Sequence, residues 1–408
     1  MQSLFSQIYK DKTVLVTGHT GFKGSWLVYW LHQMGAEVIG YSLEAPTNPN
    51  HIELLNLDIV SIIGDIRDLE KLNQTFEKYK PDIVFHLAAQ PLVRLSYENP
   101  IETYETNVIG TLKVFEACRK NNVKAIVNIT SDKAYENKEW IWGYRENDPM
   151  GGYDPYSSSK GCADILASSY RNSYFNTHDY KIKHNTLLAS CRAGNVIGGG
   201  DWAKDRLITD IMLSVSQGKK VSIRNPRATR PWQHVLEPLS GYLHIGQKLL
   251  EEKVEFAEAW NFGPSDEGSI NVEEVVKNVK KHWDKIDYEI NSDPNQLHEA
   301  NLLKLDCSKA HILLKWKDVW DSQTTFEKTV KWYKFYYEEN QNILTEQDFD
   351  SYVKDAKNKI LNINTFNPNI IPRLVKYVAY GYKPSPEQLE RIQSETIETE
   401  FSGYHEYD

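Results

Sequence analysis

Asn128-Ile-Thr-Ser-Asp-Lys-Ala-Tyr135 is followed, after a polar and aromatic loop, by Tyr153-Asp-Pro-Tyr-Ser-Ser-Ser-Lys160. In the second segment, Tyr156 and Lys160 are four residues apart, so a helix would place both side chains on one face. A lysine ammonium beside a phenol favours the phenolate and lowers the tyrosine pKa, and such a tyrosine can take a proton from an alcohol. Tyr-x-x-x-Lys also occurs by chance in many helices, so this interpretation needs support from the rest of the chain.

The first segment belongs to a regular alternation of short apolar runs and helical patterns. Ser131, Asp132 and Lys133 end one apolar run, where a buried strand would deliver polar groups to a site. The runs that we expect to be strands are Lys12–Thr17, Glu37–Ser42, Ser61–Asp65, Ile83–Leu87, Ala125–Thr130 and Asn185–Ala189. The helices expected between them include 25–34, one capped by Asp68 that runs to Lys80, and 101–121. Such an alternation predicts an α/β fold with a Rossmann-like, doubly wound parallel sheet.

A glycine loop follows the first strand and opens the first helix, with glycines at Gly18, Gly21 and Gly24. Without side chains, these residues let backbone amides approach a pyrophosphate at the positive end of the helix. The Gly-x-x-Gly-x-x-Gly spacing is a weak signal alone, but its strand-loop-helix context favours a dinucleotide site over a plain tight turn. His19 and Lys23 lie inside the loop, where one could reach a phosphate or a ribose, or both could be solvated.

The ends of the next two strands bear on the choice of cofactor. The second strand ends in Tyr41-Ser-Leu-Glu44, without an acid at the position that usually holds the adenosine ribose of NAD. No arginine cluster follows to bind the 2′-phosphate of NADP, so NAD is the favoured cofactor. Asp65 and Ile66 follow the third strand. Asp65 could accept the adenine amine, cap the next helix, or do both.

Together with Leu87-Ala-Ala-Gln90 and Asn107, these motifs resemble the extended short-chain dehydrogenase/reductase family. Longer matches resemble its sugar-nucleotide dehydratases, in particular the branch that acts on CDP-glucose. These matches are 18–27, 89–94, 131–133, 192–202, 227–235 and 298–306, within a resemblance that covers about residues 5 to 340. The resemblance implies NAD as the cofactor and a sugar nucleotide, favouring CDP-glucose, as the substrate. The residues that we expect to bind the cofactor are Gly18, His19, Gly21, Phe22, Lys23, Gly24, Asp65, Ile66, Leu87, Ala88, Ala89, Gln90, Asn107, Tyr156 and Lys160.

The resemblance also implies a 4,6-dehydration with no net redox change. Tyr156, assisted by Lys160, would take the C4 hydroxyl proton while the C4 hydride moves to NAD, and the hydride would later return to C6. Asp132 would protonate the departing C6 hydroxyl, because burial raises a carboxyl pKa in the direction that an acid needs. Lys133 would remove the C5 hydrogen, which requires its neutral form; the alternative is a surface lysine.

The remaining predicted roles concern positioning and substrate binding. Ser131, or Thr130 beside it, would hydrogen-bond to the C4 oxygen, unless this hydroxyl merely caps the strand end. Asn107 resembles a structural asparagine that orders the active-site helix. The residues that we expect to bind the substrate are Arg94, Arg192, Asn195, Arg224, Arg230, His298 and Lys304. Arg224 and Arg227 could instead form surface ion pairs, and Trp202 or Trp232 could stack on the cytosine or belong to the core.

Bulk properties exclude several other classes. The 408 residues carry a net charge of −9, which disfavours nucleic acid as a partner, and no apolar run is long enough to span a membrane. The start of the chain lacks the pattern of a signal peptide. Cysteines are few and lack metal-ligand spacing, so we expect no metal and a reducing, cytoplasmic location. They are Cys118, Cys162, Cys191 and Cys307.

The chain is expected to divide into three parts. Residues 1–190, with contributions from about 230–262, would form the NAD-binding domain. Residues 191–340 would form a smaller mixed domain for the sugar nucleotide, and residues 341–408 an extension of unknown role. The resemblance implies a homodimer, or a higher oligomer, through helices at about 101–121 and 153–175. The alternatives are a dehydratase or C4 epimerase for another sugar nucleotide, and an NAD-sensing protein without catalysis.

Overall fold

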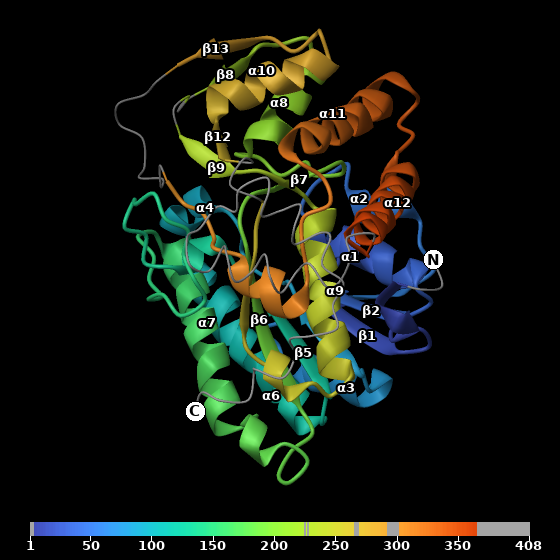
Figure 1. Ribbon diagram of the computed structural model, residues 1–408, viewed down its shortest axis with the longest axis vertical. Coiled ribbons are helices and arrows are strands. Elements are labelled where there is room, and N and C mark those ends of the chain that lie inside the picture. Colours follow the sequence, from blue (N-terminus) through green and yellow to red (C-terminus); the bar gives the residue numbers. More distant parts are fainter. Residues whose placement is uncertain (1–3, 224–225, 227, 265–268, 292–301, 365–408) are drawn as a thin grey trace, which may run out of the picture. The chain divides into compact units, whose positions relative to one another are not determined.

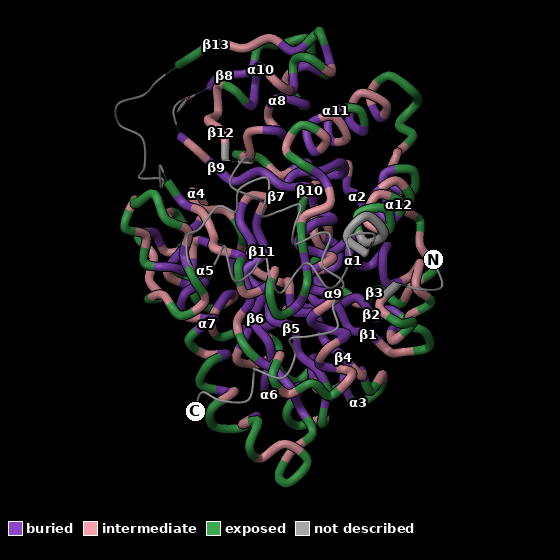
Figure 2. The backbone as a smooth tube through the Cα atoms, in the orientation of Figure 1, coloured by how far each residue is buried: buried purple, intermediate pink, exposed green. Residues whose placement is uncertain are grey.

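Six apolar runs of the first half and one strand from the second half, β11, form a seven-stranded sheet in the order β11-β6-β5-β4-β1-β2-β3 (Figure 1). All neighbouring strands are parallel, and the central ones are buried on both faces (Figure 2). The strands are β1 (Thr13–Thr17), β2 (Glu37–Ser42), β3 (Val60–Ile63), β4 (Ile83–His86), β5 (Ala125–Ile129), β6 (Leu187–Ala193) and β11 (Ala259–Phe262). The predicted Rossmann-like α/β class is confirmed.

Helices cover both faces of this sheet. On one face, apolar side chains of α3, α6 and α7 pack on Val84, Ile126 and Leu188. On the other face, α9 comes so close that a Cβ at Gly246 would stand 2.8 Å from the ring of Phe85. The helices of this part are α1 (Phe22–Gln33), α2 (His51–Leu55), α3 (Leu69–Tyr79), α4 (Val93–Glu98), α5 (Pro100–Tyr104), α6 (Thr111–Lys120), α7 (Pro155–Ser173) and α9 (Leu236–Leu250).

Two elements differ from the sequence-based expectation. β6 runs on to Ala193, four residues past the predicted end at Ala189, because Ser190 to Ala193 pair with β11. The helix predicted at 101–121 consists of α5, a π-helical segment over Glu105–Gly110 and α6. Both differences depend on tertiary pairing and packing that local sequence does not carry.

A smaller mixed lobe follows β6 in the sequence, as Figure 1 shows. Its strands pair as β7 (Val196–Ile197) with β10 (Gln233–His234), β8 (Val221–Ile223) with β13 (Tyr288–Ile290), and β9 (Thr229–Pro231) with β12 (Ser269–Asn271). Its helices are α8 (Leu207–Ser216), α10 (Val272–His282) and α11 (Ser322–Glu338). Trp202 and Trp232 are buried in the apolar core of this lobe, which is the core alternative left open above.

The computed structural model describes residues 4–223, 226, 228–264, 269–291 and 302–364. Residues 1–348 form one unit and residues 349–408 a second. The last described helix, α12 (Thr345–Asn364), begins in the first unit and continues into the second. No helix within these ranges is long and apolar enough to cross a membrane. The domain boundary near residue 190 and the role of residues 341–408 stay predictions.

We expect the Asp68→Ala substitution to destabilise the first unit by about 1 kcal/mol. Asp68 caps α3 as predicted, because its Oδ1 accepts a hydrogen bond of 3.0 Å from the backbone N–H of Lys71. Urea unfolding followed by circular dichroism measures the loss. Asn also caps helices well, so Asp68→Asn serves as the control. Equal unfolding midpoints for the wild type and the alanine variant would contradict the capping role.

Candidate active site

The turn after β5 carries three of the predicted catalytic residues. Ser131 precedes a short 3₁₀ helix, Asp132–Ala134, and its hydroxyl accepts the backbone N–H of Lys133 at 3.2 Å. Asp132 Oδ1 accepts the Ser131 hydroxyl and the Lys133 N–H, both at 2.9 Å. A Cβ at Gly194 would lie 3.1 Å from Asp132 Oδ2, so glycine there leaves room for the carboxyl group. Asp132 is therefore held inside the protein in a defined orientation.

The other two predicted catalytic residues lie on the first turns of α7. Tyr156 is held by a hydrogen bond from its backbone N–H to the Ser96 hydroxyl at 3.1 Å. Lys160 Nζ donates to the carbonyl of Ile129, at the end of β5, at 3.3 Å. Lys133 Nζ stands 6.0 Å from the centre of the Tyr156 ring. The structure thus brings the turn after β5 and the Tyr-x-x-x-Lys face of α7 together.

Loss of water determines the charges at this site. Burial raises the pKa of Asp132, which favours the protonated form that an acid needs. Burial also lowers the pKa of Lys160 to about 8. The pKa of Tyr156 is raised to about 12, opposite to the expected lowering, because burial outweighs the side-chain contact with Ser131 and the charge of Arg206. The chain alone therefore holds Tyr156 as a neutral phenol.

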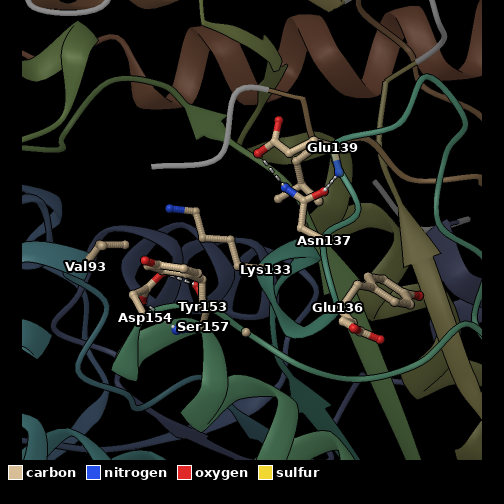
Figure 3. Close-up of a pocket in the computed structure, with 11 residues that line it drawn as sticks. Val93, Lys133, Glu136, Asn137, Glu139, Tyr153, Asp154 and Ser157 are labelled. Atoms are coloured by element: carbon tan, nitrogen blue, oxygen red, sulfur yellow. Dashed lines mark hydrogen bonds between the residues drawn. The ribbon is translucent and has the colours of Figure 1, made fainter. Parts of the chain in front are cut away.

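A pocket of about 310 Å³ opens beside this turn. In Figure 3, the Lys133 side chain points into it from the turn, with Val93 on one side and Asn137 on the other. The pocket is lined by Val93, Lys133, Tyr135, Glu136, Asn137, Glu139, Gly152, Tyr153, Asp154, Ser157 and Leu303. Lys133 is thus a pocket residue, as expected of a group that reaches a substrate, and the surface alternative is disfavoured.

The glycine loop has the geometry of a phosphate site. Gly18 has a φ of +76°, and a Cβ there would stand 2.8 Å from the backbone nitrogen of Ala88. A Cβ at Gly24 would stand 2.0 Å from the carbonyl oxygen of Gly18, so neither position accepts another residue. The N-cap of α1, Gly21, has no side-chain hydrogen bond, and the first turn holds no acid. The backbone N–H groups and the positive end of the helix dipole at the start of α1 suit a diphosphate such as that of NAD.

Of the two polar loop residues, His19 is buried and Lys23 is half-buried. His19 is buried against Gly40, and its Nε2 lies 2.7 Å from the hydroxyl of Ser61. Burial lowers the pKa of His19 to about 4, so its imidazole is neutral. Burial also lowers the pKa of Lys23 to about 8, and the charge of Asp132 acts on this lysine from the catalytic turn. Lys23 therefore faces the catalytic residues, and His19 faces β2 and β3. Phe22, beside Lys23, begins α1 and is half-buried.

The residues predicted at the adenine end are partly engaged with the protein itself. Asp65 binds Arg67 through both carboxylate oxygens, with distances of 2.6 to 3.1 Å, and does not cap α3. These contacts lower the pKa of Asp65 and leave a carboxylate that can still accept the adenine amine. Ile66 is buried against Gly110.

Asn107 joins the loop after β4 to the catalytic helix. Its Oδ1 accepts the Gln90 N–H at 2.8 Å, and its Nδ2 donates to the Gln90 carbonyl at 3.0 Å and to the Ser159 hydroxyl at 2.8 Å. At the start of the same loop, the N–H groups of Leu87 and Ala88 both donate to the Thr17 hydroxyl at 3.2 Å. Ala89 lies half-buried between these contacts. The geometry gives Asn107 the supporting role that the sequence suggested.

The structure separates the predicted substrate residues. Arg230 is buried, and its charge acts on Asp132, so it lies near the catalytic turn. Arg94 forms an ion pair of 3.4 Å with Asp205, and both side chains are half-exposed. Asn195 is half-buried, and its carbonyl oxygen accepts the Gln233 N–H at 3.4 Å.

The prediction that Arg192 binds substrate is not supported by its position. Its guanidinium is buried in an ion pair with Asp164 and donates to the Tyr135 hydroxyl at 2.6 Å. Because β6 is longer than predicted, Arg192 lies on the strand and not in the loop after it. Lys304 is half-buried, and its carbonyl accepts the N–H of Tyr144 at 2.9 Å. His298 and Arg224 lie outside the described residues.

One residue near the site, Arg206, was not predicted from the sequence. Arg206 precedes α8 and forms an ion pair of 2.6 Å with Asp201. Its charge acts on both Tyr156 and Lys23. An Asp-x-x-x-x-Arg spacing directly after the three-glycine run was the available signal. Across the part of the chain that the structure describes, no cluster of His, Cys, Asp and Glu could hold a metal.

A sheet of this order, with a glycine loop after β1 and Tyr156 and Lys160 facing the end of β5, defines an extended short-chain dehydrogenase/reductase. A family model described as "GDP-mannose 4,6 dehydratase" matches residues 15–331. The chain belongs to this family of sugar-nucleotide dehydratases. The family prediction is thereby confirmed.

Known proteins resemble the chain over most of its length. It is 54% identical to CDP-glucose 4,6-dehydratase of Salmonella typhimurium over 349 residues, which are 85% of this chain and 97% of the relative. It is 26% identical to dTDP-glucose 4,6-dehydratase of the same organism over 78% of this chain and 92% of the relative. A solved dTDP-glucose 4,6-dehydratase from Bacillus anthracis in complex with NAD superimposes with a TM-score of 0.64 at 23% identity, covering 80% of this chain and 98% of that one.

We expect Asp132→Asn to make the protein more stable than the wild type at pH 7. The folded-state pKa of Asp132 is raised, so the unfolded chain ionises first as the pH rises above about 4. The wild type then loses stability relative to the variant, and the difference disappears below about pH 4. Thermal unfolding at a series of pH values measures it. A variant that is less stable than the wild type at pH 7 would rule out the buried, destabilising carboxyl group.

Proposed function

We propose that this protein is an NAD-dependent CDP-glucose 4,6-dehydratase. It converts CDP-D-glucose to CDP-4-keto-6-deoxy-D-glucose and water, a step in deoxysugar biosynthesis. The observation that carries the proposal is the placement of Asp132 and Lys133 beside Tyr156, in a chain 54% identical to a CDP-glucose 4,6-dehydratase along 97% of that relative. The predicted cofactor is supported by NAD-bound relatives of the same fold and by the glycine loop.

The chain's own groups supply the proton transfers. Tyr156 takes the proton of the C4 hydroxyl as its phenolate, a form that the positive charge of a bound nicotinamide would favour against the effect of burial. Lys133 then removes the C5 hydrogen, which the C4 ketone has made acidic, while Asp132 protonates the C6 hydroxyl so that it leaves as water. Asp132 must be protonated and Lys133 neutral for this step, so the reactive pair carries no net charge. Burial of Asp132 favours its protonated form. Bound NAD would accept a hydride from C4 and donate one to C6.

Two observations restrict the alternatives. A C4 epimerase needs no acid and base at C5 and C6, whereas Asp132 and Lys133 both lie at the pocket turn. An NAD-sensing protein without catalysis needs neither Tyr156 nor Lys160 in reach of a substrate, and both lie at the site. A dehydratase for another sugar nucleotide is the alternative that substrate assays decide.

The purified protein should convert CDP-glucose in preference to UDP-, GDP- and dTDP-hexoses. Alkali-treated 4-keto sugars absorb in the near ultraviolet, which provides the assay. A preference for one of the other nucleotides would replace CDP-glucose in the proposal. If none of them is converted, the proposed reaction is wrong.

We expect Lys133→Ala to stop elimination while C4 oxidation still proceeds. Tyr156 remains able to take the hydroxyl proton, but no base is left for the C5 hydrogen. NADH should therefore accumulate in part, visible at 340 nm in a stopped-flow experiment, without the absorbance of the 4-keto product. Lys138→Ala, which removes an exposed lysine of the neighbouring loop, is the control. Full turnover by Lys133→Ala would refute the assignment of the base.

We also propose that two copies associate through α7 and the helices around α5 and α6. Ile101, Ile109 and Ile165 on these segments are exposed, with 75%, 44% and 56% of their surfaces accessible.

Free thiols at all four cysteines agree with the proposed reducing, cytoplasmic location.

An Ile101→Glu and Ile165→Glu double variant should sediment as a monomer, because its charges would be buried in the proposed interface. Ile182→Glu is the matched control, since Ile182 is equally exposed, at 77%, and lies outside both helices. Analytical ultracentrifugation distinguishes the variants. An unchanged dimer in the double variant would place the interface elsewhere.

A further inference from the structure

A buried ion pair lies directly behind the catalytic turn. Asp164 on α7 and Arg192 on β6 have side chains that are only 1% and 5% exposed. The guanidinium donates through Nε and Nη2 to the two carboxylate oxygens, both at 3.1 Å. Removing two charges from water is costly, and well-packed apolar side chains in their place often stabilise a protein to the same degree or more. The pair therefore calls for a role other than stability.

The ion pair holds both ends of the catalytic turn. Asp164 Oδ2 accepts the Thr130 hydroxyl at 2.6 Å, at the residue just before Ser131. Arg192 Nη1 donates to the Tyr135 hydroxyl at 2.6 Å, at the residue just after the short helix of Asp132 and Lys133. The Tyr135 hydroxyl in turn donates to Asn261 on β11 at 2.8 Å. The catalytic turn is thus bound at its start and at its end to one buried pair.

The same carboxylate faces the charge of Lys160. Asp164 follows Lys160 by four residues on α7 and so lies one turn further along the same face. Its charge raises the pKa of Lys160 against the effect of burial. The other titratable groups that act on Lys160 are His86 on β4, which burial keeps neutral with a pKa of about 3, and the cationic Lys23 on α1. Asp164 is therefore the group that favours the ammonium form.

We propose that Asp164 and Arg192 form a positioning unit that holds the turn from Thr130 to Tyr135 and keeps Lys160 charged, without touching the substrate. The consequence for turnover rests on the proposed dehydratase function. The consequence for Lys160 does not, because it concerns the titration of a side chain in the protein alone. The two consequences can therefore be tested separately.

The titration of Lys160 tests the first part. Acetylation of Lys160 in the purified protein, followed by mass spectrometry across a pH series, gives the pH at which half of this lysine reacts. In Asp164→Asn this midpoint should fall by at least about one pH unit, because the variant lacks the carboxylate charge that raises the pKa of Lys160. Asp164→Glu should restore most of it, since a second cavity of about 410 Å³ adjoins the pair and admits the longer side chain. Ser168→Ala, which lines the same cavity, is the control.

The turn is tested by a milder change, which also serves if Asp164→Asn does not fold. Thr130→Val removes only the hydrogen bond to Asp164 and keeps the shape of the side chain. It should lower kcat by roughly tenfold with little change in KM, and Thr130→Ser should restore kcat. An unchanged Lys160 midpoint in folded Asp164→Asn, or a Thr130→Val enzyme with wild-type kcat, would overturn the proposal. If the wild type converts no sugar nucleotide, the proposed function fails, and the Lys160 midpoint alone decides the inference.

Discussion

Exclusion of water from the carboxyl edge of the sheet is the constraint on which the chemistry of this protein depends. It raises the pKa of Asp132 and lowers that of Lys160, so that the protonated carboxyl group and the neutral amine are both favoured over their charged forms. The same loss of water raises the pKa of Tyr156, which works against proton abstraction. Positive charge must therefore be supplied close to the phenol, and Arg206, Lys160 and a nicotinamide cation are the available sources. The pKa values of the site are therefore set by two opposing effects, the exclusion of water and the few charged groups that remain nearby.

Features encoded by local physics were predictable from the sequence. The parallel strands follow from short β-branched runs, the start of α3 from Asp68, and the shared face of Tyr156 and Lys160 from the helical repeat. The glycine loop was predictable because Gly18, Gly21 and Gly24 stand between a short apolar run and a helical pattern. The family could also be inferred, since long motifs occupy the turns that carry chemistry. These signals depend on neighbours within a few residues.

Features that depend on distant partners were not predictable. Arg192 looked like a substrate ligand because arginine suits a diphosphate, but Asp164, 28 residues earlier, binds it in the interior. The phenol of Tyr156 was expected to be acidified by Lys160, while the depth of its burial, which decides the direction, is a property of the assembled fold. Arg206 lacked a recognised motif, and its charge acts on Tyr156 only in the folded chain, where residues 50 positions apart come together. Each case turns on solvation or pairing that the linear sequence does not display.

The rigid contact between Gly18 and Gly24 has a practical consequence for redesign of the nucleotide preference in the laboratory. Because Gly18 and Gly24 accept no side chain, changes toward a phosphorylated ribose are better made at the end of β2. There the Ser42 hydroxyl lies 2.7 Å from that of Thr20, which also donates to the carbonyl of Leu43. Exchanging Ser42 for a basic residue would leave Thr20 with one partner fewer. The two positions would have to be varied as a pair, in a combinatorial library and not by single replacements.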